Sequence, residues 1–257
     1  MAGVWLEDLT WPEAKAWFDR GAVVLVPIGA AAKEHGRHLP LKTDQVLARA
    51  FAEEVRRVLP VVVAPVICFG YYPAFRHYPG SQHLSPNTFQ ALVTEILEGF
   101  IAQGAKNLAI VNTGVSTEPP LRIVVRELYE RSGVRVPVAD IRNLGRSTDH
   151  LFEQKAGGHG DEHETSLMLA IGPESVRMDL APTDYGHALG APRTVFYLPS
   201  LFSGDPASGP DYSETGIRGD ATLASADKGR AVLDAAVCDL IEGLRSLFPD
   251  ALSAADG

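Results

Sequence analysis

The sequence from residue 23 to residue 44 reads VVLVPI, followed by GAAAKEHGRHLPLKTD. Its first six residues are apolar without interruption, which is typical of a strand buried on both faces of a parallel sheet. The loop that follows gathers five ionisable groups within twelve residues, namely Lys33, Glu34, His35, His38 and Asp44. Burying so many charges is costly unless a metal or a polar ligand compensates them. Because open α/β sheets bind ligands beyond the carboxyl ends of their strands, we predict an active-site loop here.

Strand-like and helix-like patterns alternate along the rest of the chain. Apolar runs at 61–66, 107–112 and 134–141 predict further buried strands. Segments with helical spacing of apolar residues surround them, at 9–21, 43–59, 85–104, 117–132, 167–171 and 224–247. This alternation predicts one α/β domain over residues 1–257, with a mostly parallel central sheet flanked by helices. Residues 249–257 are mostly small and polar and predict a short flexible tail.

Composition and charge exclude several classes of protein. The 257 residues are 46% hydrophobic and carry a net charge of −9, which describes an acidic, soluble protein. Lys and Arg are scattered, so we expect no nucleic-acid partner, and no apolar run is long enough to predict a membrane span. The start of the chain lacks the pattern of a signal peptide. Cys68 and Cys238 lie in apolar patterns and predict buried free thiols, which favours a cytoplasmic location.

His35 and Asp44 are nine residues apart, on the two sides of Pro40. A loop that folds back would bring the two side chains together, and imidazole with carboxylate suits Zn²⁺ or Mn²⁺. The alternative interpretation makes Asp44 the N-cap of the following helix and His35 a surface residue. The spacing alone leaves both interpretations open.

A second group of donors lies at His159, Glu162, His163 and Glu164. In a helix that starts at Glu162, the side chains of Glu162 and Glu164 point about 200° apart, so we expect only one of them to bind a metal. The other would favour the positive N-terminus of the helix. His159 lies between glycines and is a candidate general acid or base, because imidazole titrates near neutral pH. The alternative for each residue is a solvated helix cap.

Other polar and aromatic residues are candidates for binding a small-molecule substrate. Asn112-Thr113-Gly114 follows a strand and opens a helix, so its amides could hold an anion, although an ordinary helix start explains it equally well. The aromatic loop at 69–86 predicts a pocket wall, with Tyr71, Tyr72 and Phe75 as candidate wall residues. We assign His38, Tyr71, Asn112 and Thr113 to substrate binding.

Taken together, these motifs resemble the creatininase family of metal-dependent hydrolases. The resemblance runs in order from about residue 5 to residue 247, and several motifs together make it specific. Its matching segments are His35-Gly36, His38-Leu39-Pro40, Thr43-Asp44, Tyr78-Pro79-Gly80, Leu84-Ser85-Pro86, His159 with Glu164-Thr165-Ser166, Gly219-Asp220-Ala221-Thr222 and Lys228-Gly229. The resemblance implies a creatininase-like α/β fold and a divalent metal, Zn or Mn. It also implies a homo-oligomer, expected to be a hexamer.

The chain departs from the family pattern at positions that matter for the metal. The family's first acidic ligand falls on Lys33, with Glu34 one position displaced, and its N-G-H turn is Asn112-Thr113-Gly114 here. Family members typically hold two metal ions bridged by the aspartate. We therefore favour one ion, held by His35, Asp44 and Glu164, with Glu162 as the alternative acid; two ions remain possible.

Lys33 would then fill the volume of the lost cation and stabilise a developing oxyanion. In the rival interpretation, Lys33 turns outward and Glu34 becomes the ligand.

The resemblance implies hydrolysis of a small cyclic or formyl amide, in which metal-activated water attacks the carbonyl. In this interpretation His159, Lys33 and Glu34 are the catalytic residues. An alternative is the hydrolytic C–C ring opening of a small cyclic ketone, similar to an inosose. A second alternative is a non-catalytic binding or assembly protein with a degenerate site.

Overall fold

The structure, a computed structural model, describes residues 2–186, 195 and 203–253. Its centre is a parallel sheet with the strand order β1-β3-β2-β4-β5. The strands are β1 (Val4–Trp5), β2 (Val23–Ile28), β3 (Val62–Val63), β4 (Asn107–Asn112) and β5 (Val138–Asp140). The predicted fold class, a single α/β domain with a mostly parallel sheet flanked by helices, is confirmed.

Two of the predicted strands are shorter than their apolar runs. β3 pairs only at Val62 and Val63, because Pro65 has no N–H to donate to the ladder. The chain nevertheless continues alongside β2, where the N–H of Ile67 donates to the carbonyl of Pro27 at 2.9 Å. β5 begins just after Pro137 for the same reason.

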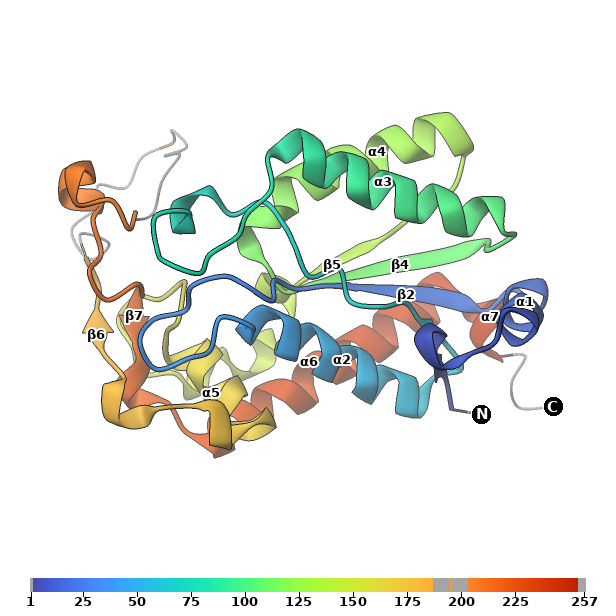
Figure 1. The fold of residues 1–257 in the computed structure, drawn as a ribbon. Coiled ribbons are helices and arrows are strands. Elements are labelled where there is room, and N and C mark those ends of the chain that lie inside the picture. The colour runs from blue at the N-terminus through green and yellow to red at the C-terminus, as the bar shows by residue number, and fades with distance from the viewer. Residues whose placement is uncertain (1, 187–194, 196–202, 254–257) are drawn as a thin grey trace.

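Helices cover both faces of the sheet (Figure 1). They are α1 (Trp11–Asp19), α2 (Thr43–Val58), α3 (Pro86–Ala102), α4 (Glu118–Ser132), α5 (Glu162–Ile171), α6 (Ala226–Leu247) and α7 (Pro249–Ser253). Helices α3 and α4 lie on one face, and α2 and α6 on the other (Figure 1). β6 (Thr183–Asp184) and β7 (Gly219–Asp220) form a separate antiparallel pair.

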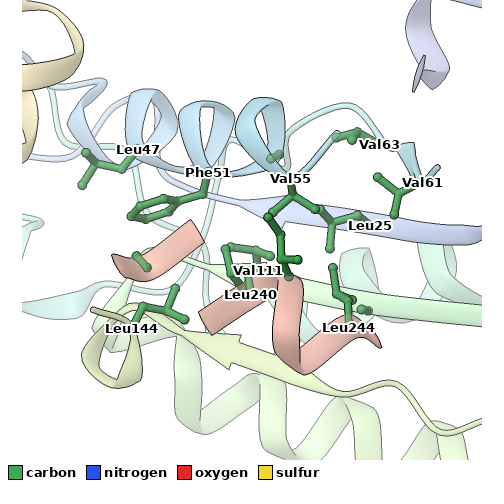
Figure 2. Close-up of a cluster of buried hydrophobic side chains, with 14 of the residues drawn as sticks. Leu25, Leu47, Phe51, Val55, Val61, Val63, Val111, Leu144, Leu240 and Leu244 are labelled. Atoms are coloured by element: carbon green, nitrogen blue, oxygen red, sulfur yellow. The ribbon is translucent and has the colours of Figure 1, made fainter. Parts of the chain in front are cut away.

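The alternation of side chains along β2 creates two hydrophobic cores. Val23 and Leu25 point toward α2 and α6, while Val24 and Val26 point toward α1, α3 and α4. Figure 2 shows the first core, in which Phe51 and Val55 of α2 face Leu240 and Leu244 of α6, with Leu25 next to Val55. Both faces of β2 are therefore buried, as its unbroken apolar run predicts.

The end of the chain differs from expectation. Residues 249–253, predicted as part of a flexible tail, form α7, because Leu252 is buried against the core below α6; residues 254–257 lie outside the described residues. Both cysteines are free, but Cys238 is exposed on α6 and Cys68 is half-buried. Among the described residues, no helix is long and apolar enough to span a membrane.

The sheet brings the polar loops to one end of the molecule. The loop after β2 leads into α2, and it touches the segment before α5, where the Cβ of a residue at Gly160 would lie 3.0 Å from the His35 carbonyl. Within the loop, Gly36 has a φ of 82°, and an added Cβ would lie 2.5 Å from Ile217. Only glycine therefore suits this turn, which folds His35 and His38 inward.

Candidate metal centre

His35 is fully buried, and both of its ring nitrogens face oxygen acceptors. Nδ1 lies 2.8 Å from the carbonyl oxygen of Lys33, and Nε2 lies 2.8 Å from Oδ1 of Asp44. Because a carbonyl oxygen only accepts, Nδ1 carries a proton, and Nε2 then needs a proton or a metal ion toward Asp44. Burial alone would lower the pKa of His35, but the charge of Asp44 and its hydrogen bond raise it.

His159 has a similar arrangement on the other side of the site. Its Nε2 lies 2.8 Å from the carbonyl oxygen of Glu34, and its Nδ1 lies 3.6 Å from Oε2 of Glu164. Burial, together with the nearby charges of Lys33 and His35, places the pKa of His159 well below its usual value. The ring is therefore neutral, and its unprotonated Nδ1 faces a carboxylate, as in a metal ligand.

His35, His159 and Glu164 offer ligand atoms that all lie within 4.8 Å of one another. Burial raises the pKa of Glu164, whose Oε2 accepts the N–H of Gly160 at 2.6 Å. Two imidazoles and a carboxylate are the donor types that zinc and manganese accept. A divalent ion would also compensate the buried carboxylate. The residues therefore fit a divalent metal, and we regard the cluster as a possible metal-binding site.

Asp44 lies in the first turn of α2, next to this cluster. Its Oδ1 faces His35, and its Oδ2 accepts from the Lys33 ammonium at 2.9 Å. Burial acts against ionisation, but the charges of Lys33 and His35 lower the pKa of Asp44 to about 2. The N-cap of α2 is Lys42, and His35 has no exposed surface. The interpretation of Asp44 as an N-cap and His35 as a surface residue is therefore wrong.

Lys33 and Glu34 point to different neighbours within the site. Lys33 is only 4% exposed, and its Nζ lies 4.8 Å from the centre of the Phe75 ring, so an outward-turned Lys33 is contradicted. Glu34 accepts the N–H of Gly36, and its Oε2 lies 3.4 Å from Nε2 of His159. Burial raises the pKa of Glu34 to about 7. Within the described residues, that Oε2 atom has no hydrogen-bond partner.

Glu162 lies away from the cluster. It has no exposed surface, and its Oε1 accepts from Nζ of Lys228 at 2.5 Å. Its Oε2 accepts the backbone N–H groups of Glu153 and Gln154 at 2.9 and 2.8 Å. The expectation that the two glutamates of this turn diverge is therefore met. The structure gives Glu162 a buried ion pair, not a place among the metal donors.

The residues assigned to substrate binding are spread over several environments. Nε2 of His38 lies 2.7 Å from the Thr165 hydroxyl. The Thr113 hydroxyl donates to the carbonyl of Asp44 at 2.7 Å, and the Asn112 amide donates to Asp140 at 3.0 Å. Tyr71 is partly buried against the core beside α3 and α4. Their visible bonds are structural; only Asn112 among them lines the cavity described next.

A cavity of about 250 Å³ of empty space, partly open to solvent, is lined by Lys33 and Asp44. His35, His159 and Glu164 are not among its lining residues. The side chains and backbone around it come from the ends of β2 and β4 and from the loop after β3; they are Ile28, Gly29, Ala30, Lys33, Asp44, Ile67, Phe69, Gly70, Tyr72, Asn112, Gly114, Ser116 and Thr117. Tyr72, one of the candidate residues of the pocket wall, lines this cavity, and its hydroxyl donates to the carbonyls of Ala32 and Gln82. Its only sequence signal was its place in the aromatic loop.

Phe75, another candidate residue of the pocket wall, lies beside the donor cluster, with its ring centre 4.4 Å from that of His159. Phe75 enters the site through a short 3-10 turn, Pro73–Phe75, and is 4% exposed. The loop at 69–86 was expected to form a pocket wall, and Tyr72 and Phe75 place it beside both the cavity and the donor cluster.

The chain is similar in sequence, over most of its length, to several named hydrolases. Creatinine amidohydrolase of Pseudomonas putida is 27% identical, over 96% of this chain and 98% of its own. The 3-dehydro-scyllo-inosose hydrolase of Thermotoga maritima is 26% identical, over 94% and 82% respectively. A mycofactocin precursor peptide peptidase of Mycobacterium ulcerans is 29% identical, over 93% and 87%. These relatives are hydrolases, which supports a hydrolase here.

The fold is also similar to solved structures of creatininases. A manganese creatininase aligns with a TM-score of 0.79 at 25% identity, over 96% of this chain and 99% of its own. A creatininase mutant of the Zn–Zn type aligns with a TM-score of 0.77 at 26% identity, over 97% and 100%. The family profile described as "Creatininase: Creatinine amidohydrolase" matches residues 7–244. The chain therefore belongs to the creatininase family.

Proposed function

We propose that this protein is a metal-dependent hydrolase that attacks the carbonyl group of a small cyclic or formyl amide. The observation that carries the proposal is the buried donor group, in which one nitrogen of His35 and one of His159 are left facing carboxylates. The ligands that we propose are His35, His159, Glu164 and Oδ1 of Asp44. The solved manganese and Zn–Zn creatininases favour manganese or zinc as the bound metal.

A divalent ion bound here would polarise a carbonyl and lower the pKa of water. The remaining chemistry falls to the side chains of this protein. Glu34, with its pKa near 7, is suited to take up and release a proton at neutral pH. His159, predicted as the general acid, donates its Nε2 proton to the Glu34 carbonyl, so we now assign it to metal binding. Lys33 is suited to stabilise negative charge on a substrate oxygen.

The substrate is expected to be small, because the relatives include a creatinine amidohydrolase and an inosose hydrolase. The inosose hydrolase among the relatives favours a second candidate, hydrolytic C–C opening of a cyclic ketone. Both reactions begin with attack on a carbonyl. A non-catalytic binding or assembly protein is the third possibility, and the gathered, buried donors argue against it.

We also propose that the protein acts in the cytoplasm as a homo-oligomer, with a hexamer expected from the family. Light scattering coupled to gel filtration measures the mass directly. A monomer at micromolar concentration would refute the oligomer.

The test of the proposed function is metal analysis of the purified protein and of His35→Ala. His150→Ala is the matched control, because His150 is exposed and lies outside the cluster. We expect the wild type and the control to bind Zn²⁺ or Mn²⁺, and His35→Ala to lose it. The loaded wild type is then screened with lactams, formyl amides and cyclic ketones. Failure to bind either metal would refute the proposal, and ketone opening alone would select the second candidate.

A further inference from the structure

The two oxygens of Asp44 face two different positive partners. Oδ1 lies 2.8 Å from Nε2 of His35, on the side of the metal donors. Oδ2 lies 2.9 Å from Nζ of Lys33, on the side of the cavity. Asp44 is 1% exposed, so neither oxygen can rely on bulk water for compensation. The carboxylate therefore joins two cationic positions, and a side chain of the protein fills one of them.

Lys33 is fixed in this position. Its backbone N–H donates to the Leu41 carbonyl at 3.0 Å, and its ammonium lies over the Phe75 ring. The side chain is 5% exposed, which leaves it little freedom to withdraw. Within the described residues, Asp44 is the only hydrogen-bond acceptor of this ammonium.

Among the described residues, the lining on the cavity side of Asp44 contains no imidazole and no further carboxylate for a second metal ion. The polar side chains around the cavity, besides Lys33 and Asp44, are Asn112, Ser116, Thr117 and Tyr72. The Asn112 amide and the Thr117 hydroxyl are already hydrogen-bonded within the fold. In the described part of the chain, the imidazoles and the further carboxylates of the site lie on the His35 side.

The charges of the site balance with one divalent ion. Three carboxylates are gathered here, those of Glu34, Asp44 and Glu164. When all three are ionised, the ammonium of Lys33 and one divalent ion neutralise them. A second divalent ion would leave a net positive charge in a buried site, which is unfavourable.

We propose that Lys33 is a built-in cation that takes the place of a second metal ion beside Asp44 and limits the protein to one divalent ion per chain. This inference deepens the proposed function and rests on it, since it assumes that His35, His159 and Glu164 bind a metal. As a consequence, a substrate oxygen that enters the cavity would contact the Lys33 ammonium in place of a second metal ion.

The test measures metal stoichiometry and affinity by calorimetry with Mn²⁺ and Zn²⁺ and by elemental analysis. The variants are Lys33→Met, Lys33→Glu and the control Lys42→Met, in which an exposed lysine of the same loop is changed. We expect one ion per chain in the wild type and in the control. Lys33→Met removes a like charge from the neighbourhood of the ion and is expected to bind the single ion at least about tenfold more tightly. Lys33→Glu adds a carboxylate beside Asp44 and is expected to bind a second ion.

The outcomes separate this inference from the proposed function. Two ions per chain in the wild type, or unchanged affinity in Lys33→Met, overturn the role of Lys33 and leave the metal-dependent hydrolase intact. A folded Lys33→Glu protein that still binds one ion also overturns it. A wild type that binds no ion overturns the proposed function itself. Because the wild-type count and Lys33→Met are informative alone, misfolding of Lys33→Glu does not prevent a decision.

Discussion

The substitution Glu162→Gln distinguishes a structural carboxylate from a metal ligand. Glu162 has no exposed surface and links α5 to α6 through Lys228 at 2.5 Å. Gln keeps an oxygen for the N–H groups of Glu153 and Gln154 but turns an NH₂ group toward the ammonium. Removing one partner of a buried ion pair costs about 3–5 kcal/mol. Lys228 keeps Glu153 and the Leu223 carbonyl as partners, so we expect the lower end, about 3 kcal/mol.

For a chain of this size, such a loss lowers the melting temperature by about 6–12 °C. The assay is thermal unfolding of the metal-free protein by circular dichroism, together with metal analysis. Glu162→Gln should melt early and still bind metal, whereas Glu164→Gln should lose the metal. Glu174→Gln, at an exposed position, is the control for both measurements. If Glu162→Gln melts with the wild type and loses the metal, Glu162 is a ligand and our description of the site is wrong.

Three further predictions concern acid stability and packing. Burial, aided by the charge of His35, lowers the pKa of His38 from 6.5 to about 4. The folded state therefore binds this proton less well than the unfolded chain, and the free energy of unfolding falls by about 3 kcal/mol as the pH drops from 6.5 toward 4. In metal-free protein, His38→Gln should reduce this loss of stability. An unchanged pH profile of urea unfolding in the variant would contradict the prediction. In Gly229→Ala the new Cβ would lie 1.8 Å from the Ser166 carbonyl oxygen, so α5 and α6 must separate, at a cost of about 3 kcal/mol. Gly243→Ala, in the same helix with open space around it, should instead stabilise by about 0.5–1 kcal/mol, and similar urea midpoints for the two would refute the packing argument. Phe51→Ala, in the core of Figure 2, should cost about 3–5 kcal/mol in urea unfolding, and a loss below 1 kcal/mol would show that the core collapses around the gap.

The regular elements could be predicted because their signals are local. The unbroken apolar run of β2 requires two covered faces, and Ser85 with Pro86 marks the start of α3, where the Ser85 side chain accepts the Thr88 N–H at 3.2 Å. β1 has only two residues, and its pairing with β3 depends on a segment far along the chain. No local pattern indicates such a strand. α7 was missed for a similar reason, since Leu252 is buried only by contact with distant parts of the core.

The site could be predicted only in part, because a loop has no periodicity to orient its side chains. The resemblance pointed to His35, Asp44, His159 and Glu164, and the structure places them together. In the aromatic loop, Tyr71 and its neighbour Tyr72 are equivalent by sequence. What distinguishes the two residues is tertiary structure, because the carbonyls of Ala32 and Gln82 accept a hydrogen bond from the Tyr72 hydroxyl.

Lys33 shows why charge in a sequence has to be interpreted together with burial. Had Lys33 been exposed, its interaction with Asp44 would be worth at most about 1 kcal/mol and would say nothing about a metal. At 4% exposure, it must be compensated, and its partner is the carboxylate that also faces His35. The count of charges then becomes a constraint, because each additional ion must be neutralised inside the protein. For this reason Lys33→Met is expected to change the affinity for the single ion, whereas Lys33→Glu, which reverses the charge, is expected to change the number of metal ions.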